Sequence, residues 1–278
     1  MDKKKQIVLV TGSDGFVGSH LMRHLSPEYI LKWYDLKRGQ DILDKKTLTE
    51  AIQGCNAVVH LAAYLSVPES HENPEKYYRN NIEGTERVFH IARDAGVERL
   101  VFASSCAARA PDSSPYAFTK HEGEKIGGLG DMKRIALRFF NIYGQGQSAA
   151  YAGVISKFRE GIRNGEIIIN GDGEQTRDYI AVEDICLAIE YGLKSNRAGT
   201  YDIGTGYGTN VNELAKVMTE ILGRNEREVK IVHAEKVKEM RHAVADITLA
   251  DKELGFKSRI NLREGLEKFL CEAHKRSI

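Results

Sequence analysis

Short apolar runs alternate with amphipathic stretches along the first half of the chain. The apolar runs have the length of buried strands, and the amphipathic stretches repeat their apolar positions with a helical period. Strands that alternate with helices form crossover units, so the pattern predicts an α/β fold with a doubly wound parallel sheet, the Rossmann type. The expected strands are 6–11, 30–34, 57–61, 99–103 and 134–139, and the expected helices are 16–25, 45–53, 75–95 and 116–126.

The pattern changes after about Phe140, where turn-rich segments separate shorter strands. We expect a smaller C-terminal α/β lobe that binds substrate, made mainly of 144–175 and 206–278. The dinucleotide-binding domain is expected to span 1–143 and to receive parts of 176–205. Further helices are expected at 152–163, 182–193, 211–222 and 262–273, and further strands at 167–169, 201–203 and 229–232.

Composition excludes several classes of partner. The 278 residues carry 40 basic and 39 acidic side chains, a formal net charge of +1, so no basic stripe is available for nucleic acid. No stretch approaches the roughly 20 apolar residues of a membrane span. The four cysteines form no Cys-x-x-Cys pair, which favours reduced thiols in a cytoplasmic protein and no bound metal.

Three glycines follow the first expected strand at intervals of three residues, Gly12, Gly15 and Gly18. The first permits a tight turn, the second lets a pyrophosphate approach the backbone, and the third lets the next helix pack closely. The helix N-terminus then offers free amides to an anion. A plain glycine-rich turn is the alternative, but the position between a strand and a helix favours a dinucleotide loop.

The second expected strand ends at Asp35, where a carboxylate can accept hydrogen bonds from the adenosine ribose. Such a carboxylate repels a 2′-phosphate, so NAD is the expected cofactor. Lys37 and Arg38 follow closely and could soften that preference, and a solvated loop aspartate is the alternative interpretation.

Tyr116 and Lys120 lie four residues apart and share one face of an expected helix. We expect the lysine charge to lower the tyrosine pKa towards neutrality, which would suit proton transfer during hydride transfer. This spacing also occurs by chance in surface pairs. Here, however, Ser104 and Ser105 follow the preceding strand and could donate to the same substrate oxygen.

With these motifs the sequence resembles the extended short-chain dehydrogenase/reductase family, in its NAD-dependent epimerase/dehydratase branch. The resemblance covers nearly the whole chain and includes Thr11–Gly18, Asp35, Asp41-Ile42, Val59–Ala63, Val67–Ser70, Asn81–Thr85, Phe102–Ser105, Tyr116/Lys120, Leu137–Gly144, Gly171–Gly173, Arg177–Tyr179, Ala181–Asp184, Ile203–Gly206, Ala245-Asp246 and Leu254–Phe256.

The resemblance implies roles for individual residues. Ser105, Tyr116 and Lys120 would be catalytic, with Tyr116 as the acid/base. The cofactor would contact Gly12, Gly15, Phe16, Val17, Gly18, Asp35, Asp41, Ile42, Leu61, Ala62, Ala63, Asn81, Ser104, Tyr116 and Lys120. The nucleotide sugar would contact Ser105, Asn141, Val154, Arg177 and Glu239. A structural ion pair with Asp178 or Asp184 is the alternative for Arg177.

Within this branch we expect an NAD-dependent nucleotide-sugar 4-epimerase of the UDP-glucose/UDP-galactose type, which oxidises C4 transiently. A dehydratase would need an acidic pair directly after the catalytic Ser, and this chain has Cys106 and Ala107 there. The family usually has Tyr-Gly where this chain has Arg109-Ala110, and the loop to Tyr116 is short. Lys236 stands where many 4-epimerases have arginine. These departures leave the sugar open.

Three alternatives remain at this stage. They are an NAD-dependent nucleotide-sugar dehydrogenase or reductase, another sugar epimerase, and a non-catalytic NAD sensor. The presence of Ser105, Tyr116 and Lys120 argues against the sensor. Relatives often dimerise through helices of the first domain, so we expect a homodimer formed by 75–95 and 116–126.

Overall fold

The computed structural model describes residues 5–126, 132–147, 153–222, 229–235 and 240–275. Its contacts divide the chain into two compact units. The first unit contains Met1–Phe139, Ile185–Ile203 and Thr248–Phe256, and the second contains Phe140–Asp184, Gly204–Ile247 and Lys257–Ile278. The segment Thr248–Phe256 belongs to the first unit, where Glu253 accepts a hydrogen bond from Tyr201 at 2.7 Å.

A six-stranded parallel sheet forms the centre of the first unit, with the order β10-β5-β4-β3-β1-β2. The predicted doubly wound α/β fold is therefore confirmed. The strands are β1 Ile7–Thr11, β2 Ile30–Tyr34, β3 Ala57–His60, β4 Arg99–Ser105, β5 Lys133–Phe139 and β10 Gly199–Ile203.

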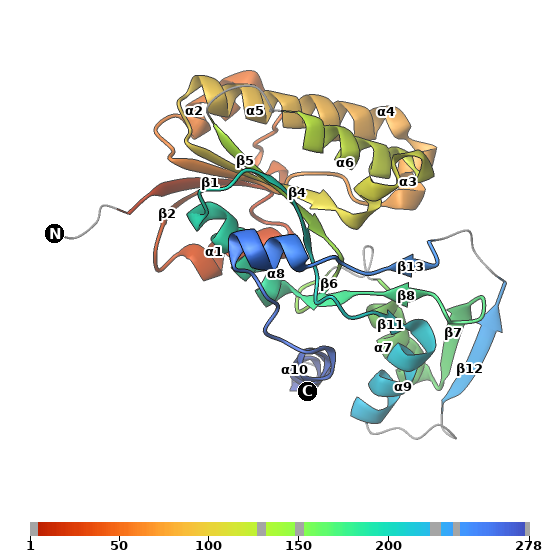
Figure 1. The fold of residues 1–278 in the computed structure, drawn as a ribbon. Helices are drawn as coiled ribbons and strands as arrows, with labels where there is room; N and C mark the ends of the chain where they lie inside the picture. Colours follow the sequence, from red (N-terminus) through yellow and green to blue (C-terminus); the bar gives the residue numbers. More distant parts are fainter. Residues whose placement is uncertain (1–4, 127–131, 148–152, 223–228, 236–239, 276–278) are drawn as a thin grey trace. The chain divides into compact units, whose positions relative to one another are not determined.

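Helices cover both faces of this sheet (Figure 1). One face carries α2, α5 and α6, and the other carries α1 and α8. Strand residues alternate between the two faces, so Leu9, Val58 and Leu100 join the buried cluster under α2 and α5. The helices are α1 Phe16–Leu25, α2 Lys45–Ile52, α3 Val67–Glu72, α4 Pro74–Tyr77, α5 Gly84–Asp94, α6 Pro115–Lys125 and α8 Val182–Lys194.

One predicted helix, 75–95, is not continuous. The structure has α4, then a π-helical turn η2 (Tyr78–Glu83), and then α5. A π-turn contains an extra residue per turn and commonly marks a functional position. Here it directs the buried Asn81 side chain towards Tyr64 and Thr119, which explains why the helix departs from regular geometry.

The second unit consists of small sheets with three helices around one apolar core. The core holds Phe158, Ile167, Leu214 and Leu266, all at most 2% exposed. Its helices are α7 Val154–Asn164, α9 Val211–Ile221 and α10 Leu262–Lys275, and its strands are β6 Asn141–Tyr143, β7 Glu166–Asn170, β8 Thr176–Arg177, β9 Tyr179–Ala181, β11 Thr209–Asn210, β12 Lys230–Ala234 and β13 His242–Ala243.

Asp178 organises the middle of the second unit. Its carboxylate is fully buried and accepts hydrogen bonds from the amides of Thr205, Gly206 and Ala245 and from the Thr205 hydroxyl. The Asp184 carboxylate accepts from the amides of Arg259 and Ile260. Both acids therefore hold loop backbone in place.

No described helix is long and apolar enough to cross a membrane.

Candidate active site

The strand order reverses around β1, because β2 lies on one side of it and β3 on the other. Ligands of open α/β sheets bind beyond the carboxyl ends of the strands at such a switch point. Thr11 ends β1 and His60 ends β3, and the two residues are register partners. The glycine loop and the segment after β3 therefore meet at this position.

The glycine loop leaves no room for side chains. Gly12 has φ +71°, and a Cβ built on it would lie 2.8 Å from the amide nitrogen of Ala62. A Cβ on Gly18 would lie 2.1 Å from the Gly12 carbonyl oxygen. Both values are shorter than real Cβ contacts, so the loop backbone packs directly on the chain that follows β3 and on the first turn of α1.

The N-terminus of α1 suits a bound pyrophosphate. The helix begins at Phe16 after Gly15, without a side-chain cap and without an acidic residue in its first turn. The first amides, which include those of Val17 and Gly18, therefore meet no anionic side chain of their own helix. The buried Ser13 hydroxyl in the same loop has no hydrogen-bond partner among the described residues. These features fit a dinucleotide diphosphate.

Asp35 is 8% exposed, so it is not a solvated loop residue. Its carboxylate accepts hydrogen bonds from the amides of Asp14 at 2.9 Å and Lys37 at 2.8 Å. Lys37 Nζ donates to the Asp14 carbonyl at 3.0 Å, and Arg38 forms an ion pair with the Asp14 carboxylate while lying over the Trp33 ring. Both basic side chains are thus directed to Asp14.

The remaining residues predicted to contact the cofactor lie close to these elements. The Asp41 carbonyl accepts from the Tyr34 hydroxyl at 2.8 Å. The Ile42 side chain is buried against Gly84 of α5, where a Cβ would meet it at 2.6 Å. Leu61, Ala62 and Ala63 directly follow β3 and are half-buried.

A chain of hydrogen bonds with defined directions runs through His60. The Thr85 hydroxyl donates to the Asn81 carbonyl, so it accepts from His60 Nε2 at 3.0 Å. His60 Nδ1 then accepts from the Thr11 hydroxyl at 2.7 Å. Burial, together with the Lys120 charge, lowers the His60 pKa from 6.5 to about 3, so the ring is neutral. This chain connects the glycine loop to the π-turn.

Asn81 extends the connection to α6. Its side-chain oxygen accepts from the Tyr64 amide at 2.9 Å, and its nitrogen donates to the Tyr64 carbonyl and to the Thr119 hydroxyl. The Thr119 hydroxyl donates in turn to the Tyr116 carbonyl at 2.8 Å. Asn81 therefore fixes the helix that carries Tyr116 and Lys120.

The residues Ser114 and Pro115 determine where helix α6 begins. The Ser114 hydroxyl accepts from the Ala117 amide at 3.1 Å, and Pro115 occupies the first helical position. This start places Tyr116 in the first turn and Lys120 one turn later, both buried. Ser105 ends β4 and hydrogen-bonds to the Tyr116 side chain. The structure thus brings Ser105, Tyr116 and Lys120 together.

The expected lowering of the Tyr116 pKa is wrong for this structure. Burial raises the Tyr116 pKa to about 12, and the hydrogen bond with Ser105 only partly opposes it. Lys120 Nζ instead donates to the Ala103 carbonyl at 2.8 Å. Burial lowers the Lys120 pKa to about 8, and the nearby Glu124 carboxylate opposes this change.

Sequence reasoning missed Glu124, Arg138 and Asp202. The Ser104 hydroxyl donates to Glu124, and Arg138 binds both Glu124 oxygens at 2.8 and 2.6 Å. Two signals in the sequence could have found Glu124 and Arg138. Glu124 continues the four-residue spacing of Tyr116 and Lys120, and Arg138 interrupts an otherwise apolar strand end.

Of the residues predicted to bind the sugar nucleotide, Ser105 lies in the first unit, and Asn141, Val154 and Arg177 lie in the second. The Asn141 amide donates to the Asp178 carbonyl at 2.9 Å, and Val154 begins α7. Arg177 is half-buried in β8 and donates to the Thr176 carbonyl at 3.0 Å. Glu239 and Lys236 lie outside the described residues.

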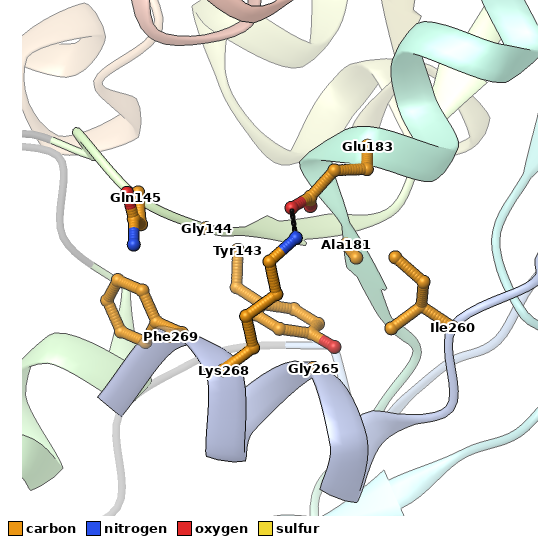
Figure 2. A pocket seen from close by; sticks show the side chains of 9 residues that line it. All are labelled: Tyr143, Gly144, Gln145, Ala181, Glu183, Ile260, Gly265, Lys268 and Phe269. Atoms are coloured by element: carbon orange, nitrogen blue, oxygen red, sulfur yellow. Dashed lines mark hydrogen bonds and ion pairs between the residues drawn. The ribbon is translucent and has the colours of Figure 1, made fainter. Parts of the chain in front are cut away.

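A small pocket in the second unit contains none of the predicted site residues (Figure 2). Lys268 and Glu183 form an ion pair at 2.8 Å at its edge. The buried Tyr143 hydroxyl beside Gly265 has no hydrogen-bond partner among the described residues. The pocket is lined by Tyr143, Gly144, Gln145, Ala181, Glu183, Ile260, Gly265, Lys268 and Phe269.

No group of three or more His, Cys, Asp or Glu side chains in the described part of the chain could hold a metal ion. The pair His20 and His24 on α1 illustrates this. His24 Nε2 forms a hydrogen bond with the Glu190 carboxylate at 2.6 Å, and His20 packs edge-on against Phe16.

A doubly wound sheet with a glycine loop at its switch point and a Ser-Tyr-Lys group in the same unit defines a dinucleotide-dependent enzyme of the short-chain dehydrogenase type. The chain belongs to the NAD dependent epimerase/dehydratase family, whose model matches residues 8–204. The predicted family, the enzyme class and the NAD cofactor are therefore confirmed.

Three similar proteins have names that specify epimerases. The UDP-glucose 4-epimerase of Mycolicibacterium smegmatis is 30% identical, over 94% of this chain and 96% of the relative. The UDP-glucuronate 4-epimerase of Thermodesulfobacterium geofontis is 31% identical, over 94% of each chain. The structure of the Thermotoga maritima UDP-glucose 4-epimerase with UDP-glucose has a TM-score of 0.89 and 29% identity, over 98% of this chain and 100% of that one.

The close packing of the glycine loop generates a test of cofactor binding. Gly12 and Gly39 have nearly the same φ, +71° and +73°, but a Cβ on Gly39 would meet nothing within 4 Å. Alanine at either position carries a backbone strain of about 1–2 kcal/mol. We expect Gly12→Ala to weaken NAD binding at least about 10-fold, roughly 1.4 kcal/mol, and Gly39→Ala to leave it nearly unchanged. Calorimetric titration with NAD measures both, and equal losses would contradict the close-packing argument.

The neutral His60 predicts a pH dependence of stability. Its pKa is about 3 in the folded protein and 6.5 when exposed, so the unfolded state binds the additional proton between these values. The free energy of unfolding should therefore fall as the pH drops below about 6.5, and less steeply in His60→Asn. Urea unfolding at pH 7, 6, 5 and 4 measures this difference. The exposed His90 gives the control His90→Asn, which should follow the parent protein. Parallel curves for all three proteins would refute a neutral buried His60.

Proposed function

We propose that this protein is a nucleotide-sugar 4-epimerase that acts on a UDP-sugar, with UDP-glucose and UDP-galactose as the preferred pair. The observation that carries the proposal is the placement of Ser105, Tyr116 and Lys120 in the same unit as the glycine loop. The names of the similar proteins support the 4-epimerase reaction, and both glucose and glucuronate occur among them.

In this mechanism Tyr116 exchanges a proton with the C4 hydroxyl of the sugar. Bound NAD supplies the hydride acceptor and donor at that carbon. The Ser105 hydroxyl shares the oxygen with Tyr116 and favours the ionised phenol, as its effect on the Tyr116 pKa indicates. Lys120, with a pKa of about 8, is mostly protonated at neutral pH and stabilises the negative charge that develops on the phenol oxygen.

The surroundings of Ser105 argue against a dehydratase. Elimination of water needs a carboxylic acid close to the sugar, and Cys106 and Ala107 follow Ser105. Glu124 is the acid near Lys120, and both of its oxygens are bound by Arg138. An ion-paired carboxylate is poorly suited to donate a proton. An epimerase needs only one group that accepts the C4 hydroxyl proton and then returns it, and Tyr116 with Ser105 and Lys120 would supply that exchange.

Asp35 and its neighbours support NAD over NADP. The buried carboxylate would face the adenosine ribose, where it would repel a 2′-phosphate. Lys37 and Arg38 could have compensated, but their side chains are directed to Asp14. Gly12, Gly15, Gly18 and the first amides of α1 would hold the diphosphate.

The test of the reaction is proton NMR of purified protein with UDP-glucose, and separately with UDP-galactose, UDP-glucuronate and the N-acetylated sugars. We expect 4-epimers to interconvert without net NADH formation, because the hydride returns to the same carbon. Stoichiometric NADH formation or consumption without interconversion would instead establish a dehydrogenase or reductase. If no sugar is converted while NAD binds, the epimerase proposal fails for these substrates.

The same assay tests the acid/base role. Tyr116→Phe should lower turnover by at least about 100-fold, since general acid–base catalysis contributes about 10²–10⁴, while the affinity for NAD stays nearly unchanged. Tyr207, 80% exposed, supplies the matched control Tyr207→Phe, which should keep full activity. Normal turnover of Tyr116→Phe would remove Tyr116 from the mechanism.

A homodimer through the predicted helices is a further part of the proposal. Tyr78 of η2 and Phe118 of α6 are 38% and 40% exposed, and their rings pack edge-to-face at 5.9 Å. Leu65 and Val67 are also exposed, at 50% and 41%, and α3 packs against α6. Neighbouring exposed apolar side chains commonly mark an association surface, and a second copy of this chain would cover them.

Sedimentation at micromolar concentration tests this surface. The parent protein should be a dimer, and Tyr78→Ser/Phe118→Ser should be largely monomeric because the apolar contact is lost. Ile168, 59% exposed in the second unit, supplies the control Ile168→Ser, which should remain dimeric. A monomeric parent protein, or a dimeric double variant, would eliminate this interface.

Localisation in the cytoplasm remains part of the proposal. Cys55, Cys106 and Cys186 form no disulfide in the part of the chain that the structure describes, which fits a reducing compartment. Cell fractionation with an antibody to this chain would test it, and recovery outside the cytoplasmic fraction would refute it.

A further inference from the structure

Three neighbouring strands of the first unit carry polar side chains at one register. Ser104 of β4 is the register partner of Arg138 of β5, and Arg138 is the register partner of Asp202 of β10. Asp202 is 7% exposed and Ser104 is 3% exposed. Polar groups in such positions destabilise the fold unless each has a partner. The row therefore needs an explanation.

Glu124 of α6 binds two members of this row of polar side chains, Ser104 and Arg138. It is 8% exposed, accepts from the Ser104 hydroxyl, and is bound by Arg138 through two parallel hydrogen bonds. Two parallel bonds between a guanidinium and a carboxylate fix orientation as well as charge. Arg138 also lies 3.9 Å from the Asp202 carboxylate. Helix α6 is thereby attached to the ends of β4 and β5.

Arg109 binds the third member of the row, Asp202. Its guanidinium forms an ion pair with Asp202. Arg109 is the last residue of the short helix η3 (Cys106–Arg109), which begins directly after Ser105. The Ser105 hydroxyl accepts from the Ala107 amide at 3.2 Å, so Ser105 is itself part of this helical turn. The loop that starts at Ser105 is thus attached to β10 through Arg109.

We propose that Arg109, Asp202, Arg138 and Glu124 form a positioning network that holds the Ser105 hydroxyl at the Tyr116 phenol. Ser105 and Tyr116 come from different elements, and the network is connected to both of them. Charges alternate along it, so every charged group has an opposite neighbour. For its activity readout the inference rests on the proposed epimerase function.

A purely stabilising role would not need this arrangement, because well-packed apolar residues often replace buried ion pairs without loss of stability. Alignment of reacting groups does need it, since a displacement of about 1 Å costs about 100-fold in rate. Asp202→Asn and Arg109→Met should therefore lower kcat about 10- to 100-fold, with KM for the UDP-sugar and NAD affinity changed less than about 3-fold.

The two substitutions act on one interaction, so their effects should not add. We expect the double variant to lose no more kcat than the more affected single variant, and Arg109→Lys to recover part of the loss. Arg93 forms an exposed ion pair with Asp94 and supplies the control Arg93→Met, which should match the parent protein. Full kcat in Asp202→Asn and Arg109→Met, or loss of stability with kcat unchanged, would overturn the proposal.

A second readout does not depend on catalysis. The protein is labelled with ¹³C at the tyrosine ζ carbon, and the Tyr116 resonance is assigned from its loss in Tyr116→Phe. In Asp202→Asn and Arg109→Met this resonance should move towards its position in Ser105→Ala, because the hydrogen bond from Ser105 is weakened. A resonance that stays at the parent position in both variants would overturn the network proposal, even if the protein had no epimerase activity. Arg109 is partly exposed, so Arg109→Met keeps the test valid if Asp202→Asn does not fold.

Discussion

Lys120 carries its ammonium group into a part of the first unit that is almost closed to water, and much of the surrounding structure follows from this burial. The group is 4% exposed and donates to the Ala103 carbonyl, and burial alone would favour the neutral amine. Glu124 one turn away favours the charged form. A low-dielectric site strengthens each of these interactions and penalises any polar group without a partner. A polar side chain is therefore stable near Lys120 only if it has a hydrogen-bond partner.

His60 and Asn81 meet this requirement in the same way. Both ring nitrogens of His60 are hydrogen-bonded, and the Asn81 side chain bonds the Tyr64 backbone and Thr119. Because each of these bonds connects a different element, the glycine loop, the π-turn and α6 are held as one assembly. The residues proposed to contact NAD and those proposed to move the proton are thus held by the same hydrogen bonds, all within the first unit.

The sequence predicted most of the elements because their apolar positions repeat with a clear period, as in α1, where Leu21, Met22 and Leu25 are buried. It predicted a continuous helix at 75–95, since one extra residue in a turn hardly changes that period, and the π-turn depends on tertiary partners of Asn81. Short strands such as β8 have too few residues to show alternation. Local spacing revealed the glycine loop and the Tyr116/Lys120 pair. It did not reveal the direction of the Tyr116 pKa, because burial is the largest influence on that phenol and only the tertiary structure shows it.

Tertiary contacts, rather than local spacing, also explain Arg109, which departs from the Tyr-Gly pattern of the family. Glu124 and Asp202 place two carboxylates around the single guanidinium of Arg138. Since Asp202 is buried, a second cation beside it removes an uncompensated charge, and Arg109 is in position to do so. That partnership depends on the register of three strands and cannot be read from the loop itself. The unusual residue is therefore explained by charge balance at the carboxyl edge of the sheet, without reference to the sugar that the protein binds.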